Sequence, residues 1–152
     1  FVIGNVPAVC LQDAPLYGIA QNCYFERYLR EQFDSRMRYT PTGISLRKDA
    51  VFLRGGRPVI YDKSEVARRY LPSDQHWRIV DFDLSDPARI TDWTHEREWR
   101  VPHCLDFDLN ECVVLLHSRD AHRQFIEECR GYTDVDILGS IEGIVCLPTV
   151  FF

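Results

Sequence analysis

Apolar side chains recur with the period of an α-helix over residues 14–33. The positions that share one face of such a helix are Leu16, Ile19, Ala20, Cys23, Tyr24 and Phe33. Asp13 comes directly before this stretch and is a candidate N-cap, because its carboxylate can accept a hydrogen bond from an unpaired N–H of the first turn. The polar residues 34–38 then end the predicted helix.

Shorter runs predict strands, because apolar and polar positions alternate in them or β-branched residues cluster. These runs span residues 44–47, 58–61, 96–101, 105–109 and 112–116, and residues 141–147 form either one last strand or a short helix followed by a strand. A second helix is expected over residues 65–70, with Ser64 as its cap. A third is expected over residues 119–130, where Ser118 caps the start and Gly131 follows the end.

The order of these elements predicts the fold class. No internal repeat and no low-complexity linker interrupts them. We therefore expect a single α+β domain over residues 1–152, with a mixed or antiparallel β-sheet core flanked by helices. Because the chain starts at Phe1, inside an apolar segment and without an initiator Met, we also expect that its N-terminus is truncated.

Composition excludes some function classes. The net charge of −5 argues against binding to nucleic acid through charge alone. No apolar run approaches the roughly 18 residues of a transmembrane helix, so we expect no membrane contact. Six cysteines stand at irregular spacings without a Cys-x-x-Cys pair, which predicts buried free thiols in a reducing cytoplasm rather than a zinc site. The acidic stretch with Asp81, Asp83 and Asp86 lacks the offsets of a calcium loop and predicts a solvated loop.

The stretch Trp93–Arg100 carries the most candidate chemistry. As a strand, it places Glu96, Glu98 and Arg100 on one face and Trp99 on the other. Two carboxylates at this spacing lie roughly 7 Å apart. Each makes ionisation of the other less favourable unless a cation such as Arg100 compensates. The alternative is a solvated strand face of mixed charge.

Several common site types are missing from the sequence. It contains no Gly-x-Gly-x-x-Gly, no P-loop and no Gly-x-Ser-x-Gly. A metal-dependent nuclease that uses Glu-x-Lys on a strand would need a Lys near position 98, where this chain has Arg97 and Glu98. A nuclease therefore stays a second alternative.

Four segments together resemble a bacterial family of AbiGi-type abortive-infection proteins and a related domain of unknown function with a Trp-x-x-Glu-x-Glu-Trp-Arg motif. The segments are Ala8–Pro15, Tyr39–Ser45, Gly56–Tyr61 and Trp93–Arg100. The resemblance covers about residues 8–105, and its Glu-x-Glu-Trp-Arg block is the most specific part. More distantly, the pattern is similar to the ADP-ribosyltransferase fold, in which a split β-sheet core holds NAD⁺.

This resemblance implies an NAD-using toxin or effector of bacterial phage defence, with NAD⁺ as co-substrate and no metal. It implies that Glu98 is the catalytic carboxylate, which holds a ribose hydroxyl while nicotinamide leaves, and that Glu96 orients or deprotonates the acceptor. The cofactor-binding candidates are Tyr39, Ser45, Arg47 and Tyr61. The acceptor would be a protein, a nucleic acid or water.

Each candidate also has a structural interpretation. Arg47 and Arg57 are expected at strand ends, where arginines usually support structure. Tyr61 and Trp93 can pack in the core. The alternative for the whole chain is a non-catalytic antitoxin or sensor module of a defence system, which binds a cognate protein. Its acidic strand face would then be a docking surface or a structural ion-pair network.

Overall fold

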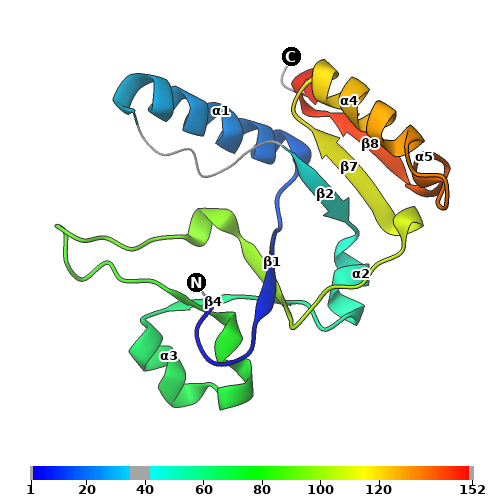
Figure 1. The fold of residues 1–152 in the computed structure, drawn as a ribbon. Helices are drawn as coiled ribbons and strands as arrows, with labels where there is room; N and C mark the ends of the chain where they lie inside the picture. The colour runs from blue at the N-terminus through cyan, green and yellow to red at the C-terminus, as the bar shows by residue number, and fades with distance from the viewer. Residues whose placement is uncertain (1, 35–41, 151–152) are drawn as a thin grey trace. The chain divides into compact units, whose positions relative to one another are not determined.

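The chain passes three times between two structural units. In the computed structural model, residues 2–34 and 42–150 are described (Figure 1). Unit 1 consists of residues 1–14 and 48–106, and unit 2 consists of residues 15–47 and 107–152. Each unit therefore combines two separate segments of the sequence.

Unit 1 is built on a three-stranded antiparallel sheet, in the order β1-β6-β3. These strands are β1 (Ala8–Gln12), β6 (Glu98–Pro102) and β3 (Arg57–Pro58). A two-stranded parallel sheet follows, formed by β4 (Ile60–Asp62) and β5 (Ile79–Asp81). The helices are α2 (Lys48–Leu53), α3 (Ser64–Tyr70) and two 3₁₀ helices, Ser73–Arg78 and Thr94–Glu96.

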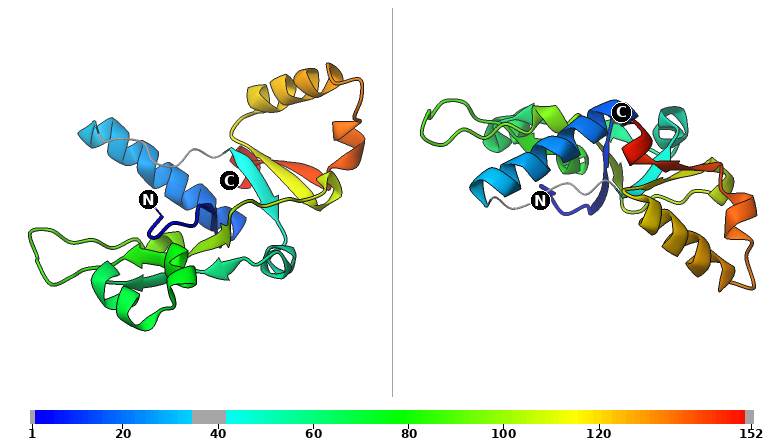
Figure 2. Two further views of the ribbon diagram at one scale, coloured as in Figure 1. Left: turned by 60° about the horizontal axis from the view of Figure 1, so that its bottom comes forward. Right: turned by 90° about the horizontal axis from the view of Figure 1, so that it is seen from above.

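Within unit 1, a long loop connects β5 to the second 3₁₀ helix; it stands out in both views of Figure 2. Backbone bonds between Asp83 and Thr91 join its two sides, with both N–H···O distances at 2.9 Å. We call residues 82–93 the arm. Its apolar side chains Leu84 and Ile90 are exposed.

Unit 2 contains a three-stranded mixed sheet, in the order β2-β7-β8. Its strands are β2 (Gly43–Leu46), β7 (Cys112–Leu116) and β8 (Gly143–Cys146), and β7 runs antiparallel to β2 and parallel to β8. The helices are α1 (Leu16–Phe33), α4 (Arg119–Arg130), α5 (Ile137–Ser140) and two 3₁₀ helices, Leu109–Glu111 and Leu147–Val150. Ala121 and Phe125 of α4 pack against Cys112, Val114 and Leu116 of β7 and so cover one face of this sheet (Figure 1).

The α+β class predicted from the sequence is confirmed, with helices and both antiparallel and parallel strand pairs. The helix predicted over 14–33 is confirmed as α1. The helix predicted over 119–130 is confirmed as α4, and its cap is confirmed because the Ser118 hydroxyl accepts the Ala121 N–H at 3.0 Å. The split-sheet arrangement that the resemblance implies stays a prediction.

Two predicted elements are wrong. Residues 105–108 form no strand, and a 3₁₀ helix starts at Leu109; Asp108 and Glu111 bond each other's backbone there as a capping box. The strand predicted over 96–101 starts only at Glu98, because Glu96 ends a 3₁₀ helix and Arg97 adopts a left-handed conformation, with φ 46° and ψ 47°.

Two predicted helix caps are also wrong. The residue before α1 is Pro15, and the Asp13 carboxylate instead binds Lys48 and Arg97. Ser64 is the first residue of α3 and does not cap it; its N–H and hydroxyl both donate to the Asp81 carboxylate. In both places the side chain has a partner distant in sequence.

Candidate functional site

Glu98 and Arg100 form a buried ion pair on one face of β6. The Arg100 Nε lies 2.7 Å from Glu98 Oε1 and its Nη2 lies 3.3 Å from Oε2, so the guanidinium contacts both carboxylate oxygens. The Glu98 side chain is 9% exposed and the Arg100 side chain 4%. Arg100 Nη1 also donates to the carbonyls of Trp77 and Ile79, at 2.7 and 3.1 Å. These bonds fix the orientation of the guanidinium and tie β6 to the start of β5.

Tyr61 of β4 contacts the backbone of the same residue, Glu98. Its hydroxyl oxygen accepts the backbone N–H of Glu98 at 2.9 Å, while the Glu98 carbonyl accepts the Val59 N–H at 3.0 Å. Burial raises the pKa of the Tyr61 hydroxyl, and the negative charges of Glu98 and Glu96 raise it further. The structure therefore brings together Tyr61 and Glu98, two of the residues predicted from the sequence, and the charge of Glu96 acts on the Tyr61 hydroxyl.

Two residues of β1 share this face of the sheet. Gln12 is paired with Glu98 and Cys10 with Arg100 in the antiparallel register, and directly opposite residues point to the same side. Cys10 is exposed, which corrects the prediction that its thiol is buried. Partial desolvation of the sulfur and the nearby Glu98 carboxylate raise the pKa of this thiol, so a smaller fraction of it is ionised than in an ordinary cysteine.

A second group of charges lies where β1 ends and β6 begins. The Asp13 Oδ2 atom is 2.6 Å from Lys48 Nζ and 3.4 Å from Arg97 Nη2. The Lys48 ammonium also lies 4.9 Å from the centre of the Trp99 ring. Asp13 thus serves as a bridge between α2 and the turn before β6, and this turn places Glu98 at the start of its strand.

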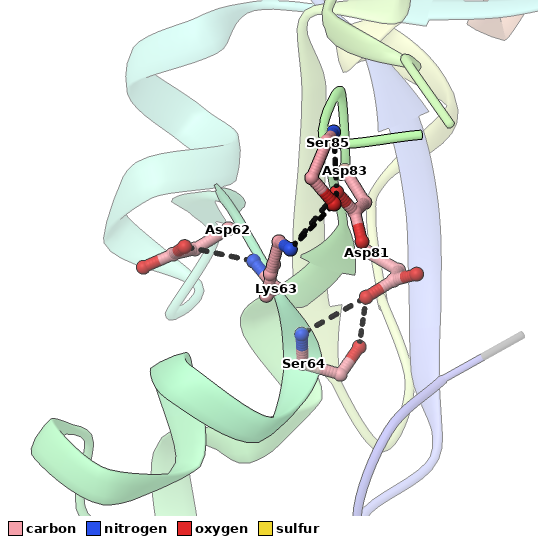
Figure 3. A network of polar contacts seen from close by, with 6 residues as sticks. All are labelled: Asp62, Lys63, Ser64, Asp81, Asp83 and Ser85. Carbon is pink, nitrogen blue, oxygen red and sulfur yellow. Dashed lines mark hydrogen bonds and ion pairs between the residues drawn. The ribbon is translucent and has the colours of Figure 1, made fainter. Parts of the chain in front are cut away.

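A polar network holds the start of the arm against the start of α3 (Figure 3). The Lys63 ammonium lies 3.0 Å from the Asp83 carboxylate and 2.9 Å from the Ser85 hydroxyl. The same Asp83 oxygen accepts the Ser85 N–H at 2.8 Å and the Ser85 hydroxyl at 2.6 Å. These contacts lower the pKa of Asp83 from 3.8 to about 2, the Ser85 hydroxyl being the largest cause. Asp81 and Asp83 therefore anchor the start of the arm, while residues 84–90 are exposed, in agreement with the solvated loop predicted from the sequence.

The remaining predicted residues have separate places. Tyr39 lies outside the described residues. Ser45 is in β2, opposite Val113, and Arg47 follows that strand; both belong to unit 2. Their grouping with Glu98 stays a prediction. The Arg57 guanidinium donates to the carbonyls of Phe52 and Gly56 and stacks 4.0 Å from the Phe52 ring centre, which agrees with the structural role expected for it.

The sequence did not indicate which residues lie opposite Glu98. Gln12 and Cys10 are more than 80 positions away in the chain, and only the register of β1 with β6 places them beside the ion pair. A clue existed for Gln12, which ends an apolar run just before a helix, a common place for site residues. The residues that anchor the arm, such as Lys63, carried no comparable signal.

Comparisons with known proteins give no further assignment: no protein-family model matches this chain, and no significant match was found among curated proteins or among solved structures. Over residues 2–34 and 42–150, no helix has the length and apolar character needed to cross a membrane. In the same ranges, no group of three or more His, Cys, Asp or Glu side chains converges to hold a metal ion.

Proposed function

We propose that this chain is an NAD-using enzyme of the ADP-ribosyltransferase-like kind and acts as a toxin or effector in bacterial phage defence. The observation that carries the chemical part is the Glu98 carboxylate at the start of β6, which is paired with Arg100 and whose backbone N–H binds the Tyr61 hydroxyl. The part concerning phage defence rests on the resemblance of the Trp93–Arg100 block.

The contacts of Glu98 leave it able to bind a hydroxyl group. Each of its oxygens receives one N–H from Arg100, and a carboxylate offers about four lone-pair positions. A ribose hydroxyl of NAD⁺ can therefore donate to Glu98 while Arg100 stays in place. The negative charge then stabilises the positive charge that develops on the ribose as the bond to nicotinamide breaks.

The reaction needs only NAD⁺ and an acceptor. The bond between nicotinamide and the ribose carbon breaks, and its electron pair leaves with neutral nicotinamide. An oxygen or nitrogen of the acceptor, or a water molecule, forms the new bond to this carbon. The proton that the acceptor loses goes to the Glu96 carboxylate, in the role of general base.

NAD⁺ binding and nicotinamide release by the wild type, compared with Glu98→Gln, test this proposal. We expect release to fall at least a hundredfold in the variant, because the neutral amide no longer stabilises the transition state. Glu65→Gln on α3 is the matched control, since Glu65 is exposed and belongs to the same unit. Circular dichroism of each variant shows whether it is folded, and intact release by folded Glu98→Gln would remove Glu98 from the mechanism.

A second function has one observation in its favour. Both oxygens of Glu98 are already occupied by a buried guanidinium, which is the arrangement of a structural ion pair. The chain would then be a non-catalytic antitoxin or sensor module that binds a protein of the same defence system. Absence of NAD⁺ binding at millimolar concentration, together with a stable complex with the product of a neighbouring gene, would favour this function.

A further inference from the structure

Gln12 carries the one buried side-chain nitrogen or oxygen that lacks a hydrogen-bond partner within residues 2–34 and 42–150. The atom is its amide nitrogen, Nε2. An amide that has left water without gaining an acceptor is unfavourable. A buried polar group of this kind indicates either strain or a place that a bound molecule completes.

The ladder between β1 and β6 places this amide beside the Glu98 side chain. The Asp13 N–H donates to the Arg97 carbonyl at 3.2 Å, so this pair is hydrogen-bonded and the next pair, Gln12 with Glu98, is not. In an antiparallel sheet the non-hydrogen-bonded pairs have the closer Cα atoms, about 4.5 Å apart, and the closer side chains. The side chains of Gln12 and Glu98 are therefore neighbours on one face of the sheet.

Tyr61 offers a further donor near Glu98, on the side of β6 that faces away from β1. Its hydroxyl oxygen accepts the Glu98 N–H, so the hydroxyl can still donate its own hydrogen to another molecule. Gln12 and Glu98 thus offer a donor and a carboxylate acceptor on neighbouring side chains. A vicinal diol matches this set, because each of its hydroxyls both donates and accepts a hydrogen bond.

We propose that Gln12 is a ligand-contacting residue, and that its Nε2 donates to a hydroxyl of a vicinal diol whose neighbouring hydroxyl is held by Glu98. The ligand class is a molecule with a pentose diol. Where this ligand is NAD⁺, the inference rests on the proposed function. The amide contributes binding and orientation, and no covalent step involves it.

The test is Gln12→Met, which keeps the length of the side chain and removes its polar atoms. NAD⁺ and ADP-ribose are the probes, titrated by calorimetry into the full chain, and thermal unfolding is measured without ligand. We expect both probes to bind about tenfold more weakly to the variant. We expect the melting temperature of the free variant to be equal or higher, because the unpaired donor is gone. Gln21→Met is the control, since Gln21 is exposed on α1.

The outcomes separate this inference from the proposed function. Binding of ADP-ribose that weakens in Gln12→Met, without nicotinamide release from NAD⁺, would support the diol site and contradict the transferase. Release of nicotinamide with unchanged affinity in Gln12→Met would support the transferase and overturn the role of Gln12. A lower melting temperature of the free variant would show that the amide is already paired within the protein. Failure of the wild type to bind either probe would show that the site does not exist. Either result would overturn the inference.

Discussion

At the scale of the residue, the buried ion pair of Glu98 and Arg100 leads to a prediction about stability. Arg100→Met would leave the Glu98 carboxylate buried without its counter-charge and the carbonyls of Trp77 and Ile79 without their donor. We expect this variant to lose about 3–5 kcal/mol of unfolding free energy, because a buried charge without a partner is costly. Urea denaturation followed by circular dichroism measures this loss.

Two variants serve as comparisons for this prediction. Arg69→Met removes an exposed arginine of α3, and its effect should stay within about 0.5 kcal/mol. The double variant Glu98→Leu/Arg100→Met removes both charges and should recover part of the loss, because an apolar pair needs no compensation. A single Arg100→Met variant as stable as the wild type would mean that the pair contributes no stability.

Asp83 gives a prediction about pH. Its folded-state pKa of about 2 lies below the ordinary value of 3.8, mainly because the Ser85 hydroxyl donates to the ionised form. A lowered pKa means that the contacts stabilise the fold above pH 3.8 and that this contribution is lost as the pH falls toward 2. We expect the NMR titration of the Asp83 carboxyl carbon to have its midpoint near 2, and the midpoint to rise in Ser85→Ala. A midpoint near 3.8 in the wild type would contradict the network.

Part of the arrangement around Glu98 could be predicted from the sequence. Glu98 and Arg100 are two positions apart, and the rule that such residues share a strand face placed them together correctly. The same rule failed for Glu96, because the left-handed conformation of Arg97 breaks the alternation one residue before the strand. Left-handed conformations are uncommon outside glycine, and nothing in the identity of an arginine indicates one.

At the scale of the element, the turn between α2 and β3 depends on the size of Gly56. A Cβ atom at this position would lie 2.5 Å from Val51 Cγ1 and 2.7 Å from the Val51 carbonyl oxygen, so the backbone would have to move. We expect Gly56→Ala to lower the unfolding free energy by about 1–3 kcal/mol through overpacking. Gly43→Ala in β2 is the matched control, because a Cβ atom there meets nothing within 4 Å. Equal stabilities of the two variants would contradict this account.

Elements with local signals were the easiest to predict. The signals for α4 lie close together in the sequence: a serine cap before the helix, a defined length and a glycine after its end. The structure confirms this helix. The strand predicted over 58–61 is instead divided, because Val59 separates β3 from β4 and the two strands join different sheets. Strand partners are chosen by residues distant in the chain, so periodicity alone does not reveal them.

At the scale of the whole molecule, both units depend on contacts between distant segments. β1 pairs with β6 across some 90 positions, and β2 pairs with β7 across about 70. Each strand was predicted from a short stretch of sequence, whereas the sheet that contains it forms by pairing of segments distant in the chain. This is why composition and pattern indicated an α+β protein but did not show that Gln12 lies opposite Glu98.

The division into units leads to a last prediction, for the fragment of residues 1–106. It contains both segments of unit 1, so the pairs of β1 with β6 and of β4 with β5 are complete. It lacks β7, the partner of β2. We therefore expect slow amide hydrogen exchange in β6 and fast exchange in residues 15–47. Unit 1 has only roughly 70 residues, so its stability should be below that of the full chain.

The same fragment separates the two groups of predicted cofactor residues. Tyr61 and Glu98 stay in the folded part, whereas Ser45 and Arg47 lie in the segment that has lost its partner strand. If NAD⁺ binds through unit 1 alone, the fragment should bind it with nearly the affinity of the full chain. If Ser45 and Arg47 also hold the cofactor, the affinity should fall at least tenfold, as expected for the loss of a charged contact. Calorimetry of the fragment beside the full chain therefore determines which unit binds the cofactor, provided that hydrogen exchange has shown unit 1 to be folded.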